Sequence, residues 1–274
     1  MFASLTVVTH PKRRLVSALL RARRLARAAA ARPDITFARA LQTGTFRSDT
    51  LPPYVPARVA VMLWGREADA LDEVDARVMA PLADGAAQRW RVLLRPASVH
   101  GAWAGFCPNE VDADDRHNAK SLRAEEPVVV LIHGVLRARY LVKFTRDSAE
   151  VGKQLARTAG YLGGLALSDT PLTTASFSCW RSVQDSRAFA FAAGTHRDAY
   201  KVDRAEHRHA TEFFVRFRPL YSEGTFEGRD PLAGVLDRNA TGRDLAPPDS
   251  GAGEWRAARA TSRTGESSHE DATR

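Results

Sequence analysis

His196 is the residue whose position best suits metal coordination. It follows a predicted helix break at Gly194 and falls in the first turn of the next predicted helix. A helix N-terminus disfavours the charged imidazolium, so the ring stays neutral and can coordinate iron. A solvent-facing histidine near a helix start is the alternative. Tyr200 follows on the same helical face, where it either lines a pocket or packs half-buried.

A tryptophan and an arginine belong to a pattern that the chain contains twice. The first copy runs through Trp64, Arg95-Pro96, Gly101 and Gly105. The later copy runs through Trp180, Arg218-Pro219, Gly224 and Gly228, with the same six-residue and four-residue spacings after the arginine. Large aromatics at strand ends usually belong to a core, although Trp180 could also stack on a flat ligand. Both copies keep the arginine, which favours a structural role for Arg218; a carboxylate contact is the alternative.

The repeat indicates two similar halves packed as an internal pseudo-dimer. A repeated unit of roughly 100–120 residues is too long for a solenoid. We expect an α+β fold of tandem ferredoxin-like halves, with any ligand between or inside them. The expected organisation is a first half over 1–107, a linker over 108–126, a second half over 127–235 and a disordered tail over 236–274.

Hydrophobic patterns predict the order β-α-β-β-α-β plus one short strand in each half. In the first half the expected strands are 5–9, 35–41, 59–64, 90–94 and 100–104, with helices over 12–31 and 68–79. In the second half the strands are 128–132, 161–167, 174–180, 213–218 and 221–226, with a helix over 140–157. A further helix is capped by Ser182, breaks at Gly194 and restarts at Thr195, ending near His209.

Alternation along the strands assigns side chains to two faces. We expect one face to pack under helices: Val59, Val61 and Leu63, and likewise Ala175, Phe177 and Cys179. The other face should line a shared interior: Ala60, Met62 and Trp64, with Thr174, Ser176, Ser178 and Trp180. The interior of the second half would then be the more polar one. His133 could reach this interior, whereas His207 and His209 are expected to be solvated.

Composition limits the class of protein. The chain has 274 residues, 44% hydrophobic and 26% charged, which is ordinary for a globular protein. No apolar run is long enough to span a membrane, and the N-terminus lacks the basic region of a secretory signal, so we expect a cytoplasmic protein. Cys107 and Cys179 show no metal-binding spacing, and Cys179 is expected to be buried.

The net charge of +8 does not by itself predict nucleic-acid binding, because no zinc-finger, basic-zipper or RNP-type motif accompanies it. Basic residues concentrate from Lys12 to Arg32. That segment is either a solvated helix face or a peripheral contact with anionic membrane, with Leu15, Leu19 and Leu20 on its apolar side. The chain also lacks a Walker loop, a Gly-x-Gly-x-x-Gly helix start and a Gly-x-Ser-x-Gly elbow.

The second half resembles the spheroidene monooxygenase family of carotenoid ketolases. The resemblance lies in Thr173-Thr-Ala-Ser-Phe-Ser-Cys-Trp180, Arg187-Ala-Phe-Ala190, Gly194-Thr-His196, Glu212-Phe-Phe-Val-Arg-Phe-Arg-Pro219, Glu223-Gly-Thr-Phe-Glu-Gly228 and Asp230-Pro-Leu232. In the first half, residues 37–44 and Gly101-Ala-Trp-Ala-Gly105 are similar to that family's motifs. The similarity covers about residues 3 to 235.

The resemblance implies a dimeric α/β barrel, built here by two halves of one chain. It also implies a haem-dependent monooxygenase that oxidises a hydrophobic, carotenoid or polyene-like substrate. We assign the iron to His196 and further haem contacts to Arg218, Tyr200 and Trp180. An external electron donor such as ferredoxin is then needed, since no flavin or nicotinamide signature is present. The alternatives are a non-catalytic barrel that binds haem or a hydrophobic ligand, and a cofactor-free monooxygenase of secondary metabolism.

Overall fold

The structure, a computed structural model, describes residues 1–11, 15–45, 54–103, 106, 122–191, 202 and 205–236. The chain divides into a compact unit, Met1–Asp237, and a second unit, Arg238–Arg274, whose residues lie outside the described ones. The predicted linker lies mostly outside the described residues, as does the tail. Cys107, His196 and Tyr200 also lie outside them.

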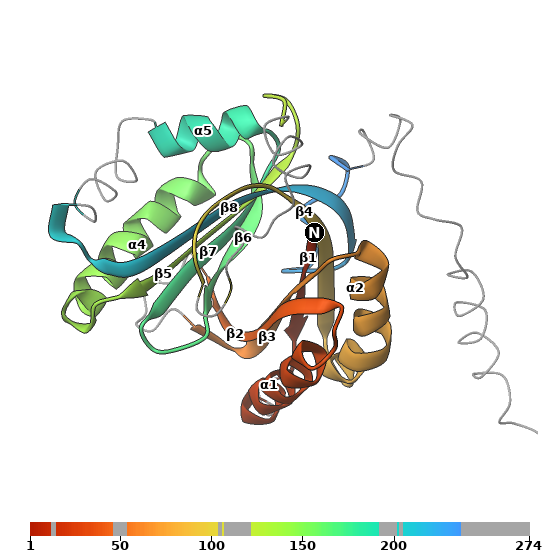
Figure 1. The fold of residues 1–274 in the computed structure, drawn as a ribbon. Helices are drawn as coiled ribbons and strands as arrows, with labels where there is room; N and C mark the ends of the chain where they lie inside the picture. The colour runs from red at the N-terminus through yellow and green to blue at the C-terminus, as the bar shows by residue number, and fades with distance from the viewer. Residues whose placement is uncertain are drawn as a thin grey trace, which may run out of the picture. The chain divides into compact units, whose positions relative to one another are not determined.

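The strands of the first unit form one closed antiparallel barrel (Figure 1). The first half of the chain contributes β1 (Phe2–Thr9), β2 (Ile35–Gly44), β3 (Tyr54–Gly65) and β4 (Gln88–Gly101). The second half contributes β5 (Val128–Leu136), β6 (Tyr161–Ser168), β7 (Thr173–Trp180) and β8 (His209–Gly224). The strand order is β1-β3-β2-β6-β7-β5-β8-β4, which closes because β4 pairs with both β1 and β8.

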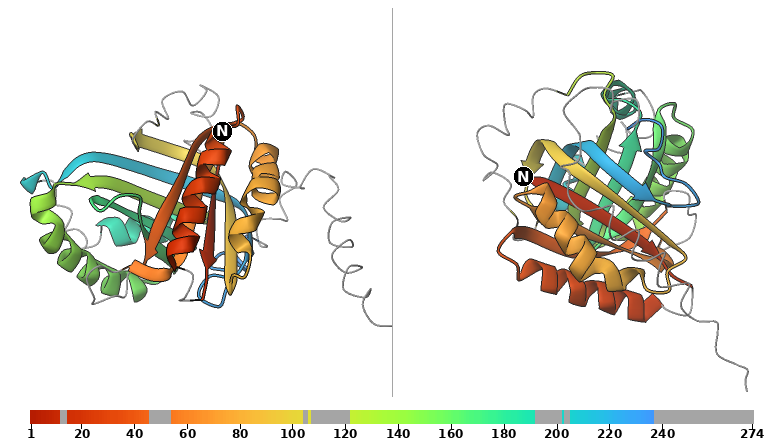
Figure 2. Two further views of the ribbon diagram at one scale, coloured as in Figure 1. Left: turned by 90° about the horizontal axis from the view of Figure 1, so that it is seen from below. Right: turned by 90° about the vertical axis from the view of Figure 1, so that its right-hand side faces the viewer.

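The two halves share one strand order, β4-β1-β3-β2 and β8-β5-β7-β6. They join where β4 pairs with β8 and where β2 pairs with β6. Helices α1 (Leu15–Ala30) and α2 (Ala68–Val74) lie on the outer side of the first half, and α4 (Leu141–Ala156) and α5 (Val183–Phe191) on that of the second (Figures 1 and 2). A π-helical turn, Asp75–Met79, and 3₁₀ turns, Ala80–Ala83 and Ala138–Tyr140, adjoin α2 and α4. The fold is therefore an α+β barrel.

The two Arg-Pro pairs do not end strands, so the prediction of separate short strands there is wrong. Both β4 and β8 run unbroken through them. A register shift follows each proline and leaves one extra residue, Ala97 in β4 and Leu220 in β8. A bulge of this kind accommodates a residue without an N–H donor. Arg95 pairs directly with Arg218, so the two copies of the motif meet at the seam between the halves.

The glycines after these motifs end the two long strands. Gly101 has φ +78° and Gly224 has φ +81°, in the left-handed region that favours glycine. A Cβ at Gly101 would overlap the carbonyl oxygen of Glu212 in β8, and one at Gly224 would overlap that of Arg89 in β4. The repeated six-residue spacing thus brings each strand end against the start of the other long strand.

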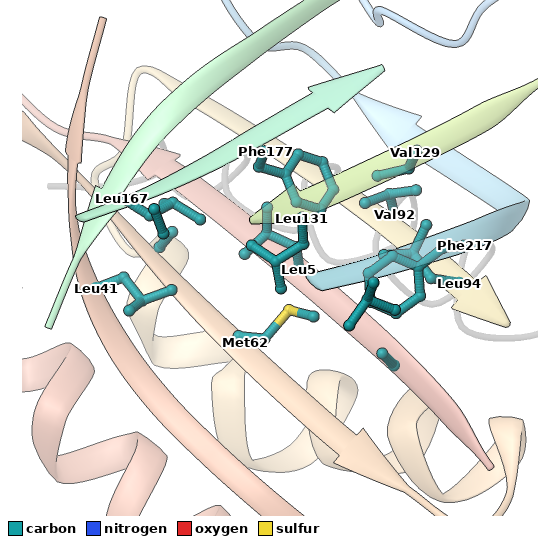
Figure 3. Close-up of a cluster of buried hydrophobic side chains, with 14 of the residues drawn as sticks. Leu5, Leu41, Met62, Val92, Leu94, Val129, Leu131, Leu167, Phe177 and Phe217 are labelled. Atoms are coloured by element: carbon teal, nitrogen blue, oxygen red, sulfur yellow. The ribbon is translucent and has the colours of Figure 1, made fainter. Parts of the chain in front are cut away.

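Side chains fill the middle of the barrel (Figure 3). Leu5, Met62, Leu131, Phe177 and Phe217 come from both halves and are almost completely inaccessible. Side chains with no accessible surface leave no water-sized space beside them, and an eight-stranded barrel is just wide enough to be filled in this way. The prediction of a ligand space inside the barrel is therefore wrong for this layer.

The predicted faces are correct in the first half and reversed in the second. Ala60, Met62 and Trp64 point into the barrel core, as predicted. In β7 the inward side chains are Ala175, Phe177 and Cys179. Burial raises the pKa of the Cys179 thiol, as expected for an inert core cysteine.

A one-residue offset explains the reversal. By strand register, Trp64 in β3 takes the place of Cys179 in β7, and Gly65 takes the place of Trp180. Aligning the two halves on their tryptophans, Trp64 and Trp180, therefore shifts one strand by one residue relative to the other. Because successive residues of a strand point to opposite faces, that shift inverts every side chain.

Helix α1 packs through small residues. Ala18, Ala22, Ala26 and Ala29 form its buried face, while Leu20 is exposed. The predicted membrane contact, Lys12 to Arg32, begins in residues 12–14, which lie outside the described ones. Among the described helices, none is both long and apolar enough to cross a bilayer.

Candidate functional site

A row of side chains that are only partly covered crosses the outer face of the second-half sheet, and we call this row the open face. Its members stand in register on neighbouring strands: Ala166 of β6, Ser176 of β7, Ile132 of β5 and Phe214 of β8. None of the four is fully buried, and Ile132 is 43% exposed although β5 lies between β7 and β8. Helices normally cover an apolar side chain in the middle of such a sheet, so this face offers a surface for a ligand.

The matching row of the first half is sealed. By register, Thr6 in β1 corresponds to Ile132, and it is only 3% exposed. The Thr6 hydroxyl donates to Asp75 at 3.0 Å, beside the end of α2. Arg91 in β4 takes the place of Phe214 and forms ion pairs with Asp72 and Asp75. In the first half, carboxylates from the helix layer thus cover the row that is only partly covered in the second half.

Trp180 accounts for part of this difference. Gly65 occupies its place in the first half, where an added Cβ would lie 3.3 Å from Leu71 of α2. In the second half the buried indole of Trp180 stands between the sheet and Phe189 of α5, with ring centres 5.3 Å apart. A tryptophan therefore separates α5 from the sheet at a position where α2 packs directly against its strand.

The helices beside the open face carry apolar side chains that face solvent. Leu141 and Val142 at the start of α4 are exposed, and Phe191 at the end of α5 is among the most exposed large hydrophobics described. Residues of this kind gathered beside an uncovered sheet mark a binding surface better than scattered ones would.

The segment that contains His196 and Tyr200 follows α5 and precedes β8 in the sequence. It leaves α5 at Phe191, and the described chain resumes fully at 205. There Glu206 accepts a hydrogen bond from Lys143 of α4 at 2.7 Å, and buried Arg208 donates to Asp147 of α4 at 2.7 Å. Both predicted ligands therefore lie between α5 and β8 in the sequence, outside the described residues.

Two of the predicted site residues lie within the described part, at the end of the sheet where α5 begins. Arg218 points outward and donates to Glu126 at 3.0 Å. Burial would raise the pKa of Glu126, but the hydrogen bonds from Arg218 and Arg123 outweigh it and lower the pKa. Trp180 packs under α5 and does not face the barrel interior, where it had been expected, because of the one-residue offset.

His209 also differs from its prediction. Rather than being solvated, it is half-buried, and its Nε2 lies 3.2 Å from the Thr174 hydroxyl on β7. Its ring covers Gly134 of β5 and meets Phe144 of α4 edge-on, with centres 5.1 Å apart. His209 therefore closes the sheet at one end of the open face. Its neighbour His207 is exposed, as predicted.

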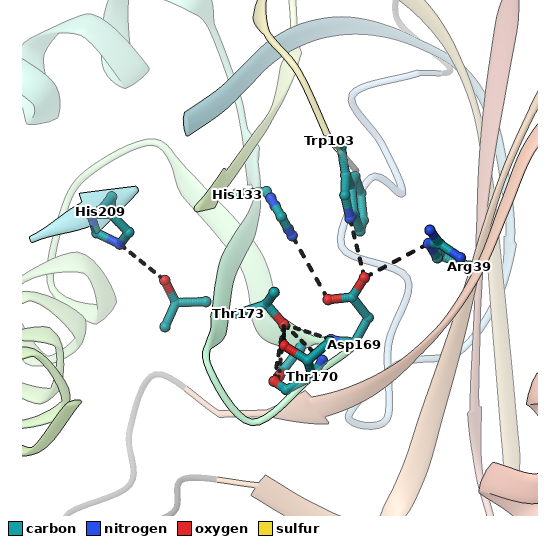
Figure 4. Close-up of polar contacts among 9 residues, drawn as sticks. Arg39, Trp103, His133, Asp169, Thr170, Thr173 and His209 are labelled. Carbon is teal, nitrogen blue, oxygen red and sulfur yellow. Dashed lines mark hydrogen bonds and ion pairs between the residues drawn. The ribbon is translucent and has the colours of Figure 1, made fainter. Parts of the chain in front are cut away.

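A second polar group lies inside the barrel, on the other side of β5 (Figure 4). His133 reaches this interior, as the sequence suggested, and is 2% exposed. Its ring stacks on Trp103 at 4.3 Å, and its Nε2 lies 3.9 Å from Asp169, too far for a hydrogen bond. Trp103 donates to the same carboxylate at 3.2 Å.

Asp169 is the ionised residue of this polar cluster inside the barrel. Burial would raise the pKa of Asp169, but the nearby His133 and the hydrogen bond from Trp103 hold the pKa well below its ordinary value. Arg39 lies 3.8 Å from the same carboxylate. Sequence patterns missed Asp169, because it sits in the turn between β6 and β7 and comes close to Trp103 only through the barrel.

Comparison with known proteins gives distant relatives. A spheroidene monooxygenase from Rhodobacter capsulatus is 27% identical over 212 residues, which is 75% of this chain and 85% of that protein. A spheroidene monooxygenase from Cereibacter sphaeroides is 25% identical over 207 residues, which is 74% of this chain and 62% of that protein. No family model matches the chain. The chain is a distant relative of the spheroidene monooxygenases.

Among solved structures, an aldoxime dehydratase in complex with butyraldoxime has a TM-score of 0.55. It is 11% identical, and the match covers 86% of this chain and 84% of that one. At that identity the likeness concerns the fold alone.

Two of the segments that resemble spheroidene monooxygenases contribute residues to the open face. Ser176 comes from the β7 motif, Phe214 from the β8 motif, and Arg187 from the α5 motif. The Gly-Thr-His motif with His196 directly follows α5 in the sequence. The strands β7 and β8, which carry these motifs, therefore contribute residues to the open face as well as to the barrel core.

Proposed function

We propose that the protein is a monooxygenase that oxidises a hydrophobic, carotenoid or polyene-like substrate at the open face. The observation that carries this proposal is the contrast between the two matched rows. Thr6 is sealed under carboxylates of the helix layer, whereas Ile132 is 43% exposed in the same position. Two of the segments that resemble spheroidene monooxygenases, in β7 and β8, contribute Ser176 and Phe214 to the exposed row.

We further propose haem as the cofactor, with His196 as its iron ligand. The described residues suit such a group, because an uncovered apolar row can receive a flat macrocycle that the packed barrel centre cannot. In the sequence His196 lies between α5 and β8, and the described residues just before β8 bond to α4. When bound, haem would supply the oxygen-activating chemistry. Tyr200 lies four residues beyond His196 and is proposed as a further contact.

The protein's own residues would position the substrate and limit water. Ile132 and Phe214 offer apolar contacts, and the exposed side chains of Leu141, Val142 and Phe191 can close over an apolar molecule. The hydroxyl of Ser176 is the polar group in the middle of the row. This arrangement would hold a long apolar substrate by its shape and leave few polar groups to orient it.

The wider setting of the reaction is part of the same proposal. An external electron donor such as ferredoxin would supply reducing equivalents, and the solvent face of α1 would meet either that donor or an anionic membrane surface. The two halves, 1–107 and 127–235, are proposed to derive from a duplication. The repeated Arg-Pro motif that meets at the seam supports this origin.

The test is reconstitution with haem followed by turnover. We expect a Soret band in the wild type that is lost in His196→Ala and kept in His207→Ala, a matched change at an exposed histidine. Failure to take up haem, or an unchanged band in His196→Ala, would refute the haem assignment. Oxidation of a polyene under labelled dioxygen, with a ferredoxin and its reductase, then distinguishes an oxygenase from a binding protein. Turnover without haem would indicate a cofactor-free enzyme.

A further inference from the structure

Two arginines beside the open face have no acidic partner among the described residues. Arg216 follows Phe214 on β8 and stands in register with Val130 of β5 and Ser98 of β4. The carbon of its guanidinium lies 4.8 Å from the centre of the Phe214 ring. Its aromatic neighbour is therefore a member of the open face itself.

Arg187 reaches the same place from the helix layer. It lies one helical turn after Val183, which is buried against the sheet, and one turn before the exposed Phe191. Burial and then the positive charge of Arg187 lower the pKa of the Arg216 guanidinium. Two like charges therefore face each other where the sheet meets α5.

Two acidic residues at the start of α5 already accept hydrogen bonds. Glu126 accepts hydrogen bonds from Arg218 at 3.0 Å and from Arg123 at 2.8 Å. Asp185, on the first turn of α5, accepts a hydrogen bond from Ser182 at 2.8 Å. In the described part of the chain, neither residue pairs with Arg187 or Arg216.

Uncompensated like charges destabilise a half-buried site unless an anion joins them. A guanidinium suits a carboxylate, because its planar N–H groups can donate two parallel hydrogen bonds to the two oxygens. The cationic pair lies directly beside an apolar row, so an occupant that matches both surfaces must be amphipathic.

We propose that Arg187 and Arg216 bind a carboxylate of the molecule that occupies the open face, which is therefore an apolar ligand with at least one acidic group. This inference rests on the proposed function only in taking the open face as the ligand site. The carboxylate can belong to the propionates of haem or to an acidic lipid-like molecule. Both sources share the chemistry, and the experiment separates them.

The experiment compares each acid with its neutral counterpart. Hemin is titrated against hemin dimethyl ester, and pyrenebutyrate against pyrenebutanol, with the full-length wild type and the variants Arg216→Gln and Arg187→Gln. Arg23→Gln, at an exposed arginine of α1, is the matched control. Unfolding curves report whether each variant folds, and we expect Arg216→Gln to be at least as stable as the wild type, because it removes a like-charge contact.

We expect the wild type to bind each acid about tenfold more tightly than its neutral counterpart, the effect of one charge-assisted hydrogen bond at a partly exposed site. Each arginine variant should lose most of that preference, and the control should keep it. Binding of pyrenebutyrate without hemin would support the carboxylate site and count against haem. Equal binding of acid and neutral forms by the wild type would overturn the inference while leaving the haem proposal intact. Absence of binding by all four probes would count against both.

Discussion

Thr6 and Ile132 allow the same substitution to be made in a sealed and in an open environment. They occupy matching positions in β1 and β5. Thr6→Trp must place an indole where 3% of the side chain is exposed and where the hydrogen bond to Asp75 is lost. Overpacking costs about 1–3 kcal/mol, and the loss of a hydrogen bond to the partly buried Asp75 carboxylate costs about 1 kcal/mol more. We predict a loss of about 3 kcal/mol or more for Thr6→Trp.

Ile132→Trp should behave differently, because 43% of the isoleucine is already exposed. We predict a change in stability within about 1 kcal/mol, as for surface substitutions. The new indole would occupy the open face, so hemin and pyrenebutyrate should bind at least tenfold more weakly, whereas Ile132→Val should bind both as the wild type does.

Urea unfolding and probe titration at pH 7 measure both effects. With a slope of roughly 3 kcal/mol per molar urea, the Thr6→Trp midpoint should fall by about 1 M and that of Ile132→Trp by much less. The reasoning fails if the two tryptophan variants lose equal stability. It fails equally if Ile132→Trp binds both probes with wild-type affinity.

Three further predictions concern stability, each measured by unfolding. Phe177→Ala should cost about 3–5 kcal/mol of stability, because the ring lies in the packed barrel centre. The protein that remains folded should still bind the probes, and loss of binding would indicate a ligand site inside the barrel. Gly101→Ala should cost at least about 2 kcal/mol and Gly228→Ala only about 1 kcal/mol, since both have positive φ but only Gly101 meets a carbonyl oxygen; equal losses would exclude the close approach. Asp169→Asn should lose about 2 kcal/mol at pH 7. Because folding lowers the pKa of Asp169, the ionised carboxylate stabilises the folded state at any pH above the pKa of Asp169 in the unfolded chain. The stability deficit of Asp169→Asn should therefore narrow as the pH falls below about 5. A deficit that does not change with pH would contradict this role of the carboxylate.

Much of the fold could be predicted from residue patterns, because each strand and helix is set by local periodicity. The alternation in 59–64 and 174–180 predicted β3 and β7, and the repeated motifs predicted two similar halves. The continuity of β4 and β8 could not be predicted. A proline in a strand normally signals an end, and only the partner strand shows that Pro96 and Pro219 sit beside bulges.

The site was predicted less well, for a reason that lies in the register. The polar alternation of Thr174, Ser176 and Ser178 was visible in the sequence, and so was its contrast with the first half. Which side of the sheet it faces depends on a one-residue offset that only the strand partners define. Arg216 and Ile132 could not be found from sequence, because their surroundings in the described part of the chain, no acidic partner for one and no covering helix for the other, leave no pattern in the residues.

The packed barrel centre and the open face have one physical origin. Both halves contribute inward side chains to a single core, so a cavity there would destabilise the whole barrel. The outer faces are covered by separate helix layers, and one layer can move away without opening the core. In the first half, Asp72 and Asp75 hold their layer against Thr6 and Arg91. The second half has Ile132 and Phe214 in the places of Thr6 and Arg91, so no such hydrogen bonds or ion pairs can form. A ligand that covers these apolar side chains would stabilise this half as the carboxylates stabilise the other.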